Sequence, residues 1–244
     1  MIALLDEIFS QAGKDFTIEQ ASVGFFTTGV VSVSPKGKKY CGLASTLKEG
    51  VCSGGLRAGL KLKGENTLNI ATELVSGTGP EISLAFACLN SCLPEVNFLE
   101  INAQEIIETR GAGKKVAVIG HFPFVTRLYE IASVLKVSEL SPKSEKDITA
   151  QEMEKFLGEV DVIALTALTL MNGTFEKIIS SCRRDSFKVL LGPSAPMHPS
   201  LLNYVDCVCG TFVCDPSLLL SDLSEGKSFR LLRGKKAVAI GRIS

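Results

Sequence analysis

The sequence predicts an α/β protein: a C-terminal Rossmann-like parallel sheet flanked by helices, with a smaller N-terminal α+β domain. Two observations carry this prediction. After residue 114, short apolar runs alternate with segments of helical spacing, which is typical of parallel βαβ units with right-handed crossovers. Before residue 111, a β-rich stretch is followed by helices, which is an α+β pattern. The glycine-rich segment at 111–113 therefore separates predicted domains of residues 1–110 and 111–244.

The N-terminal domain is predicted to contain a helix, a β-hairpin and three further helices. The spacing predicts a first helix over 2–11, and residues 22–34 form a β-rich stretch. A Pro-Lys-Gly turn follows, so that residues 39–46 can return as the partner strand. The remaining helices are predicted over 68–75, 80–92 and 102–109.

The C-terminal domain is predicted to alternate strands and helices from its first residues to its last helix. Five parallel strands are predicted over 115–120, 137–140, 161–167, 188–192 and 207–213. The helices between and after them are predicted over 124–135, 149–160, 174–182, 199–204 and 215–226. Thr149 and Glu152 form a capping box, and Asp215 is predicted to cap the last helix. A final apolar run over 235–240 is one more strand, which the pattern does not place in the sheet.

The composition argues against nucleic acid and membranes as partners. Lys plus Arg equals Asp plus Glu at 26 each, so no electrostatic attraction to nucleic acid or an anionic surface is expected. The longest apolar stretch, 162–171, is about half of the roughly 20 residues that span a bilayer. The first residues lack a basic region and read as an amphipathic helix, not a signal peptide. These features predict a cytoplasmic protein without membrane insertion.

The eight cysteines are predicted to be reduced, because no secretion signal accompanies them. Cys207 and Cys209 are followed by Cys214, which is not a zinc-finger spacing, and the first two share one strand face. Cys88 and Cys92 share one helix face. Neither group supplies four ligands by itself, so buried thiols without a structural partner are expected.

The candidate ligand-binding residues are those that directly follow the strands, because ligands of open parallel sheets bind at the carboxyl ends of the strands. Four strands contribute such residues: Gly120, His121 and Phe122; Glu139; Thr166, Asn172, Gly173 and Thr174; and Gly192, Pro193, Ser194 and His198. Only Gly120 of a G-x-G-x-x-G fingerprint is present, and bulky side chains would block the pyrophosphate. The sequence therefore argues against an NAD site.

Two of these segments admit a functional and a plain structural interpretation. Glu139 lies 19 residues after Gly120, where a ribose-binding acid sits in dinucleotide-binding proteins, and it is equally interpretable as a solvated acid. The Asn172-Gly173 turn is predicted to expose backbone amides that bind an anion, with Thr174 as cap. The alternative is a well-capped helix without a ligand.

The two histidines are the only ones in the chain, and each follows a predicted strand. If the strand order is 3-2-1-4-5, the strands before His121 and His198 are neighbours at the point where the order reverses. Paired imidazoles there could ligate a transition metal, while chance placement of two polar residues is the alternative. Three prolines between Pro193 and Pro199 make a stiff loop that holds Ser194 and His198 in place.

Several segments resemble one known family. They are KVAVIGHFPF at 115–124, NGT at 172–174, GPSAP at 192–196, CGLA at 41–44 and LAFACLN at 84–90. Together they resemble the family described as "putative heavy-metal chelation", whose members join an enolase N-terminal-like domain to a Rossmann-like domain. The resemblance implies a cleft between the two domains, lined by the strand-end loops, and adds Asn90 to the ligand-binding candidates.

The leading hypothesis is therefore binding of a small anionic ligand or a metal complex in that cleft, in heavy-metal chelation or homeostasis. A transition or heavy metal ion is the cofactor that this hypothesis implies, and a homo-oligomer is compatible with it. The alternative is an enzyme that acts on a nucleotide-like or anionic small molecule in the same cleft. Glu139 or His121 would then serve as acid or base.

Overall fold

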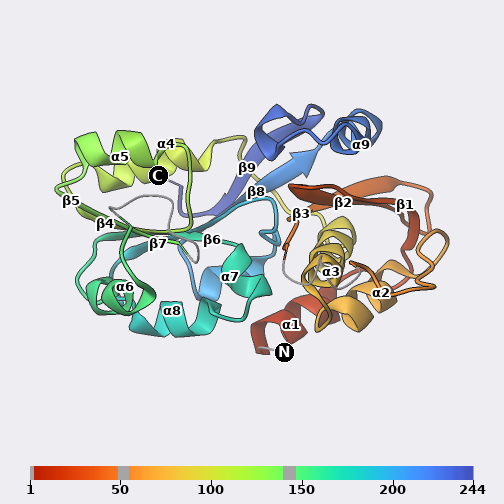
Figure 1. Ribbon diagram of the computed structural model, residues 1–244, viewed down its shortest axis with the longest axis horizontal. Helices are drawn as coiled ribbons and strands as arrows, with labels where there is room; N and C mark the ends of the chain where they lie inside the picture. Colours follow the sequence, from red (N-terminus) through yellow and green to blue (C-terminus); the bar gives the residue numbers. More distant parts are fainter. Residues whose placement is uncertain (1–2, 49–54, 140–146, 244) are drawn as a thin grey trace.

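The computed structural model describes residues 3–48, 55–139 and 147–243, and it contains two β-sheets that lie side by side (Figure 1). The smaller sheet has three antiparallel strands in the order β1-β2-β3, and the larger one has six strands in the order β5-β4-β6-β7-β8-β9. Helices pack against both sheets. The predicted fold class is confirmed: a mostly parallel sheet flanked by helices is joined to a smaller α+β part.

The N-terminal unit is formed by the three-stranded sheet and three helices. Its elements are α1 (Ala3–Gln11), β1 (Thr17–Val23), β2 (Thr27–Val33), β3 (Lys39–Ser45), α2 (Thr67–Leu74) and α3 (Gly79–Ser91). The single strand expected over 22–34 is wrong, because the chain reverses after Val23 and resumes as β2. The apolar pair Phe25 and Phe26 in this turn is typical of a strand, yet Phe25 is 62% exposed. The preceding strand β1 was not predicted.

Helices cover both faces of the three-stranded sheet. On one face α3 lies directly on β3, because Gly42 has no side chain and a Cβ there would collide with the carbonyl of Ala87. On the other face lies α9 (Pro216–Ser224), where Leu220 and Leu223 pack over Gly29 of β2. A helix from late in the sequence thus completes the core of the N-terminal unit.

The C-terminal unit is built on the six-stranded sheet. Its strands are β4 (Lys115–Ile119), β5 (Val134–Ser138), β6 (Val162–Thr166), β7 (Phe187–Leu191), β8 (Cys207–Val213) and β9 (Lys235–Gly241). Its other helices are α4 (Ala103–Gly111), α5 (Val125–Ile131), α6 (Ala150–Leu157), α7 (Leu168–Met171), α8 (Phe175–Ser181), η2 (Pro199–Asn203) and η3 (Phe229–Leu231). Helix α4 packs on β6, β7 and β9 of this sheet. The boundary between the two domains, expected after residue 110, stays a prediction.

Most elements of the C-terminal unit agree with the sequence, and one boundary is wrong. The capping box of Thr149 and Glu152 is present at the start of α6, and Asp215 caps α9 through the amide of Leu218. The helix expected over 124–135 ends at Ile131. The next apolar residues form β5 instead, because Val134 pairs with Lys115 of β4. The end of the strand expected over 137–140 lies outside the described residues.

The strand order differs from the one that the sequence analysis considered. Counted along the chain, the five parallel strands lie in the order 2-1-3-4-5, so β4 has β5 on one side and β6 on the other. The point of reversal therefore lies between β4 and β6. The last strand, β9, lies outside β8 and runs antiparallel to it. The apolar run over 235–240, which the sequence pattern did not place in the sheet, is thus its outer strand.

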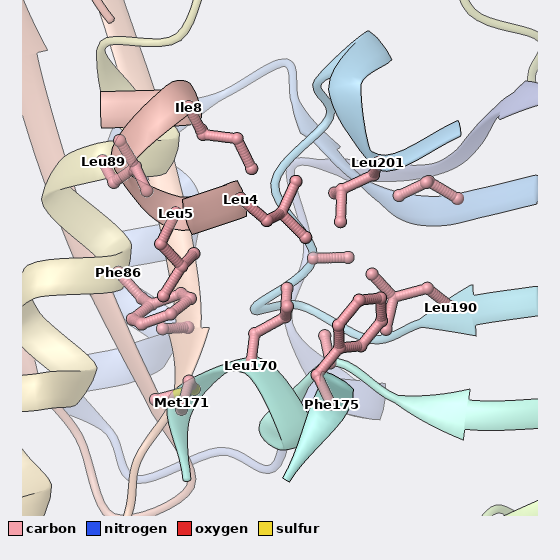
Figure 2. Packing of buried hydrophobic residues seen from close by; sticks show 14 of the residues in the cluster. Leu4, Leu5, Ile8, Phe86, Leu89, Leu170, Met171, Phe175, Leu190 and Leu201 are labelled. Carbon is pink, nitrogen blue, oxygen red and sulfur yellow. The ribbon is translucent and has the colours of Figure 1, made fainter. Parts of the chain in front are cut away.

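One hydrophobic core joins the two units. Figure 2 shows side chains of α1 and α3 facing those of α7, α8, β7 and η2. The residues labelled there are Leu4, Leu5, Ile8, Phe86, Leu89, Leu170, Met171, Phe175, Leu190 and Leu201. Burial of this apolar surface, at about 25 cal/mol per Å², holds the units together. No helix within the described ranges is long and apolar enough to cross a membrane.

Candidate functional site

The carboxyl ends of the parallel strands place several candidate residues against one another. Gly120 follows β4 and Thr166 ends β6, and these strands are neighbours at the point of reversal. A Cβ built on Gly120 would lie 3.0 Å from the Cβ of Thr166 and 3.2 Å from the ring of Phe122. Gly120 also has a φ of +106°, which favours glycine. These three residues therefore lie in contact, as strand-end candidates should.

The two histidines are not on neighbouring strands. His121 follows β4 and His198 lies beyond β7, and β6 separates these strands, so the strand order considered for a histidine pair is wrong. His121 is exposed. His198 is 1% exposed and lies at the start of η2, in the contact with α1.

The environment of His198 is a hydrogen-bonded contact between the two units. Its Nδ1 accepts from the backbone N–H of Ser200 at 3.3 Å, and the Ser200 hydroxyl donates to the carboxylate of Glu7 on α1 at 2.6 Å. Burial lowers the pKa of His198, and the nearby Glu7 charge opposes this shift. The neutral imidazole thus serves as a cap for η2, where sequence reasoning expected a ligand group.

The loop after β7 also connects the two units. Ser194 is buried, and its hydroxyl accepts a hydrogen bond at 2.8 Å from the backbone N–H of Ser45 at the end of β3. Gly192, with a φ of +128°, and Pro193 bring the chain to this position. A Cβ on Gly192 would lie 3.9 Å from the amide nitrogen of Ala167, so this loop lies beside the start of α7.

The segment after β6 is held by its own side chains. Thr166 Oγ1 accepts from the amide of Leu168 at 3.3 Å. Asn172 Oδ1 accepts from both the amide and the hydroxyl of Thr174, at 3.1 and 2.7 Å. Thr174 is the N-cap residue of α8, but its side chain makes no capping hydrogen bond. The Thr174 amide after the Asn172-Gly173 turn is therefore already bonded to Asn172, and anion binding by the amides of this turn stays a prediction.

The two remaining candidates lie in different surroundings. Asn90, near the end of α3, donates from Nδ2 to the carbonyl of Leu43 in β3 at 2.8 Å. Its Oδ1 is buried and accepts no hydrogen bond from any residue that the structure describes. Glu139 is half-buried and directly follows β5, at the outer side of the sheet.

A cavity of about 350 Å³ lies where the two units meet, and we call it the junction cavity. Its lining comes from α1, the segment between α2 and α3, α3 itself, and α7 with the turn that follows. The residues are Leu5, Val75, Ser76, Phe86, Leu170, Met171 and Gly173. Five of these seven are apolar and none is charged. Ligand pockets of proteins typically measure about 300–1,000 Å³ and are lined mainly by apolar side chains.

Only Gly173 of the junction cavity was among the sequence-based candidates. Its φ of +74° requires glycine at this point of the turn. Leu170 and Met171 belong to the apolar run 162–171, which as sequence is indistinguishable from a core segment. Leu5, Val75 and Phe86 come from three separate segments, and no local pattern links them.

A second cavity, of about 400 Å³, lies near the amino-terminal ends of β4 and β5. Its charged lining residues are partly paired: Lys115 lies 3.3 Å from Glu159, and the Lys136 ammonium lies 4.6 Å from the ring centre of Phe156. Because the strand-end loops lie at the opposite edge of the sheet, this cavity is separate from the sequence-predicted candidates. It draws residues from the C-terminal unit alone.

The ligating side chains form no group of three or more His, Cys, Asp and Glu residues within the described ranges. The seven described cysteines are free thiols, and Cys52 lies outside the described residues. Burial raises the pKa of the Cys41 and Cys92 thiols to about 12 each and that of Cys182 to about 11. The reduced state expected from the sequence stays a prediction.

Comparison with solved structures supports the same fold. A protein of unknown function from the DUF364 family of Pyrococcus horikoshii superposes with a TM-score of 0.79 at 22% identity, over 98% of both chains. A protein of the same family from Desulfitobacterium hafniense gives a TM-score of 0.75 at 22% identity, over 97% of this chain and 96% of that one. At these identities the likeness concerns the fold.

Comparison of sequences assigns the family. The chain is 26% identical over 238 residues to an uncharacterized protein of Methanocaldococcus jannaschii, covering 93% of this chain and 90% of the relative. A family model described as "putative heavy-metal chelation" matches residues 102–241, and a second model with the same description matches residues 5–93. The first model is DUF364 and covers more than half of the chain, so the chain belongs to the DUF364 family; the second model is DUF4213.

Proposed function

We propose that the protein binds a small organic molecule in the junction cavity, and that a metal at this site is carried by that molecule. The observation that supports the proposal is the cavity of about 350 Å³ whose lining comes from both units. The cavity lies at the border of the shared core, where α1, α3 and α7 meet. The lining residues Ser76 and Gly173 are exposed, so the cavity is open to solvent, and a ligand that binds only the folded protein would stabilise it.

The chemistry of the lining specifies the ligand more closely. Leu5, Phe86 and Leu170 offer an apolar surface, while Ser76 and the backbone at Gly173 offer polar groups. Such a site favours a molecule with an apolar or aromatic body and a single polar or anionic end. The family description fits this proposal if the metal arrives as an organic complex, because the described residues present no group of three ligating side chains.

The fluorescent probe 8-anilinonaphthalene-1-sulfonate tests the proposal, since it combines an aromatic body with one anionic group. The native protein should bind one equivalent with a rise in fluorescence. The substitution Met171→Trp places a larger side chain in the cavity lining and should weaken binding by roughly tenfold or more, about 1.4 kcal/mol.

The matched control is Leu202→Trp, which adds the same side chain at an exposed position of η2. It should leave probe affinity unchanged. Because the chain contains no native tryptophan, each variant also carries a single tryptophan whose emission reports its surroundings. Equal probe affinity in Met171→Trp and the native protein, with both folded, would contradict the proposal.

A further inference from the structure

The two cysteines of β8 place their sulfur atoms in contact. Cys207 and Cys209 alternate along the strand and face the same side of the sheet, and their Sγ atoms lie 3.6 Å apart. They are 0% and 4% exposed. Both belong to the apolar layer beneath α4, together with Ile106 and Ile107. The junction cavity does not include them, so they are unrelated to the proposed ligand site.

The sulfur separation selects one coordination geometry. A metal ion bonded to cysteine sulfur at about 2.3 Å spans two sulfurs 3.6 Å apart with an angle near 100°. This angle is close to that of tetrahedral or pyramidal coordination. A linear two-coordinate ion would require the sulfurs to lie about 4.6 Å apart. The pair is therefore arranged for an ion that binds two sulfurs at a bent angle.

The two thiols share a hydrogen bond. The contact between the two sulfurs lowers the pKa of Cys207 and raises that of Cys209, because the hydrogen bond stabilises one thiolate and holds the other proton. A thiophilic ion that displaces this proton gains both sulfurs at once. The first proton is thus lost more easily than from an isolated buried thiol.

The two cysteines lie opposite small residues of the neighbouring strand, in a packed part of the core where Leu202 and the carbonyl of Asp206 lie against Gly241. Across β8 and β9, Cys207 pairs with Gly241 and Cys209 with Ala239. Neither partner carries a side chain beyond a methyl group. β9 is an edge strand of the sheet. On the side away from β8, only the backbone of Leu99 pairs with it among the described residues, at Ala239. Local opening of an outer strand costs less than opening of the sheet interior, so this side is the route to the pair.

We propose that Cys207 and Cys209 form a bidentate thiol site for trivalent arsenic and for thiophilic ions of the same bent geometry. Phenylarsine oxide is the probe. Each thiol forms one arsenic–sulfur bond, and the arsenic–oxygen double bond is lost. The oxygen leaves as water with the two thiol protons, and arsenic stays in the trivalent state.

The test is intact mass spectrometry of the native, reduced protein after reaction with one equivalent of phenylarsine oxide. One adduct per chain is expected, and it should be lost in Cys207→Ser and in Cys209→Ser. The matched control is Cys88→Ser with Cys92→Ser, which removes the buried pair of α3 and should keep the adduct. Circular dichroism checks that each variant is folded.

Peptide mapping of the native protein gives a second readout that needs no variant. After reaction, unfolding and alkylation, the tryptic peptide of residues 189–227 contains Cys207, Cys209 and the exposed Cys214. Cys207 and Cys209 should be protected from alkylation, while Cys214 should be alkylated. Adduct formation only after unfolding, or an adduct that maps to Cys88 and Cys92, would overturn the proposal.

Discussion

The loops after β4 and β7 emerge at the same edge of the sheet and each carries a histidine, yet they differ in what covers them. His121 is exposed, whereas His198 is 1% exposed and caps η2 against α1. The Glu7 carboxylate of α1 binds Ser200 two residues further on. Strand order and direction thus determine which loops share an edge of the sheet. The element that packs on each loop determines whether the polar residue of the loop is exposed to solvent or is buried in a structural hydrogen bond.

The largest effect that tests this comparison is expected from truncation of the two histidines. His198→Ala should lower the free energy of unfolding by about 2–3 kcal/mol, because it leaves a buried space and removes the acceptor of the Ser200 amide. His121→Ala should change it by less than about 0.5 kcal/mol. Urea unfolding measures both values. Equal losses in the two variants would show that the contrast between the loops is wrong.

The hydrogen bond between the β7 loop and β3 should have a smaller effect. Ser194→Ala removes the acceptor of the Ser45 amide and should cost about 1–2 kcal/mol. The control is Ser180→Ala, an exposed serine that bonds only within its own helix, and little change is expected there. If Ser194→Ala is as stable as the native protein in urea, this loop does not join the units.

The smallest of these effects is a dependence of stability on pH. Burial lowers the pKa of His198 in the folded state, so the unfolded state binds the proton more readily. The contribution of neutral His198 to the free energy of unfolding is fully present above pH 6.5, the ordinary pKa of histidine. It is lost as the pH falls below that value. Unfolding midpoints at pH 7.5 and 5.5, about one unit on either side of that value, should differ less in His198→Asn than in the native protein. An unchanged difference would assign the pH dependence to other groups.

Much of the fold was predictable from sequence because its signals are local. Apolar runs between capped helices located the parallel strands, and the Thr149 capping box located a helix start. The strand order was not predictable, because a crossover of a given length can place the next strand on either side of the strand before it. The break between β5 and α5 was misplaced, because Val134 and Leu135 fit helix and strand equally and only pairing with β4 decides.

The candidate site was predictable only in part, for a related reason. The position after a strand identified Gly120 and Thr166, which the structure brings into contact. The residues of the junction cavity come from distant segments and are mostly apolar, so in the sequence they resemble ordinary core residues. Ser194 follows a strand, as expected, but Ser45, whose amide donates to the Ser194 hydroxyl, lies 149 positions away in the sequence. Long-range contacts of this kind leave no pattern in one sequence.

Methyl NMR during titration with 8-anilinonaphthalene-1-sulfonate reports directly on whether small molecules enter the junction cavity. The methyl resonances of Leu5, Val75, Leu170 and Met171 should shift together and saturate at one equivalent. The resonances of Val134, which lines the second cavity near the amino-terminal ends of β4 and β5, should not move. Shifts confined to Val134, or spread over the surface without saturation, would contradict binding in the junction cavity.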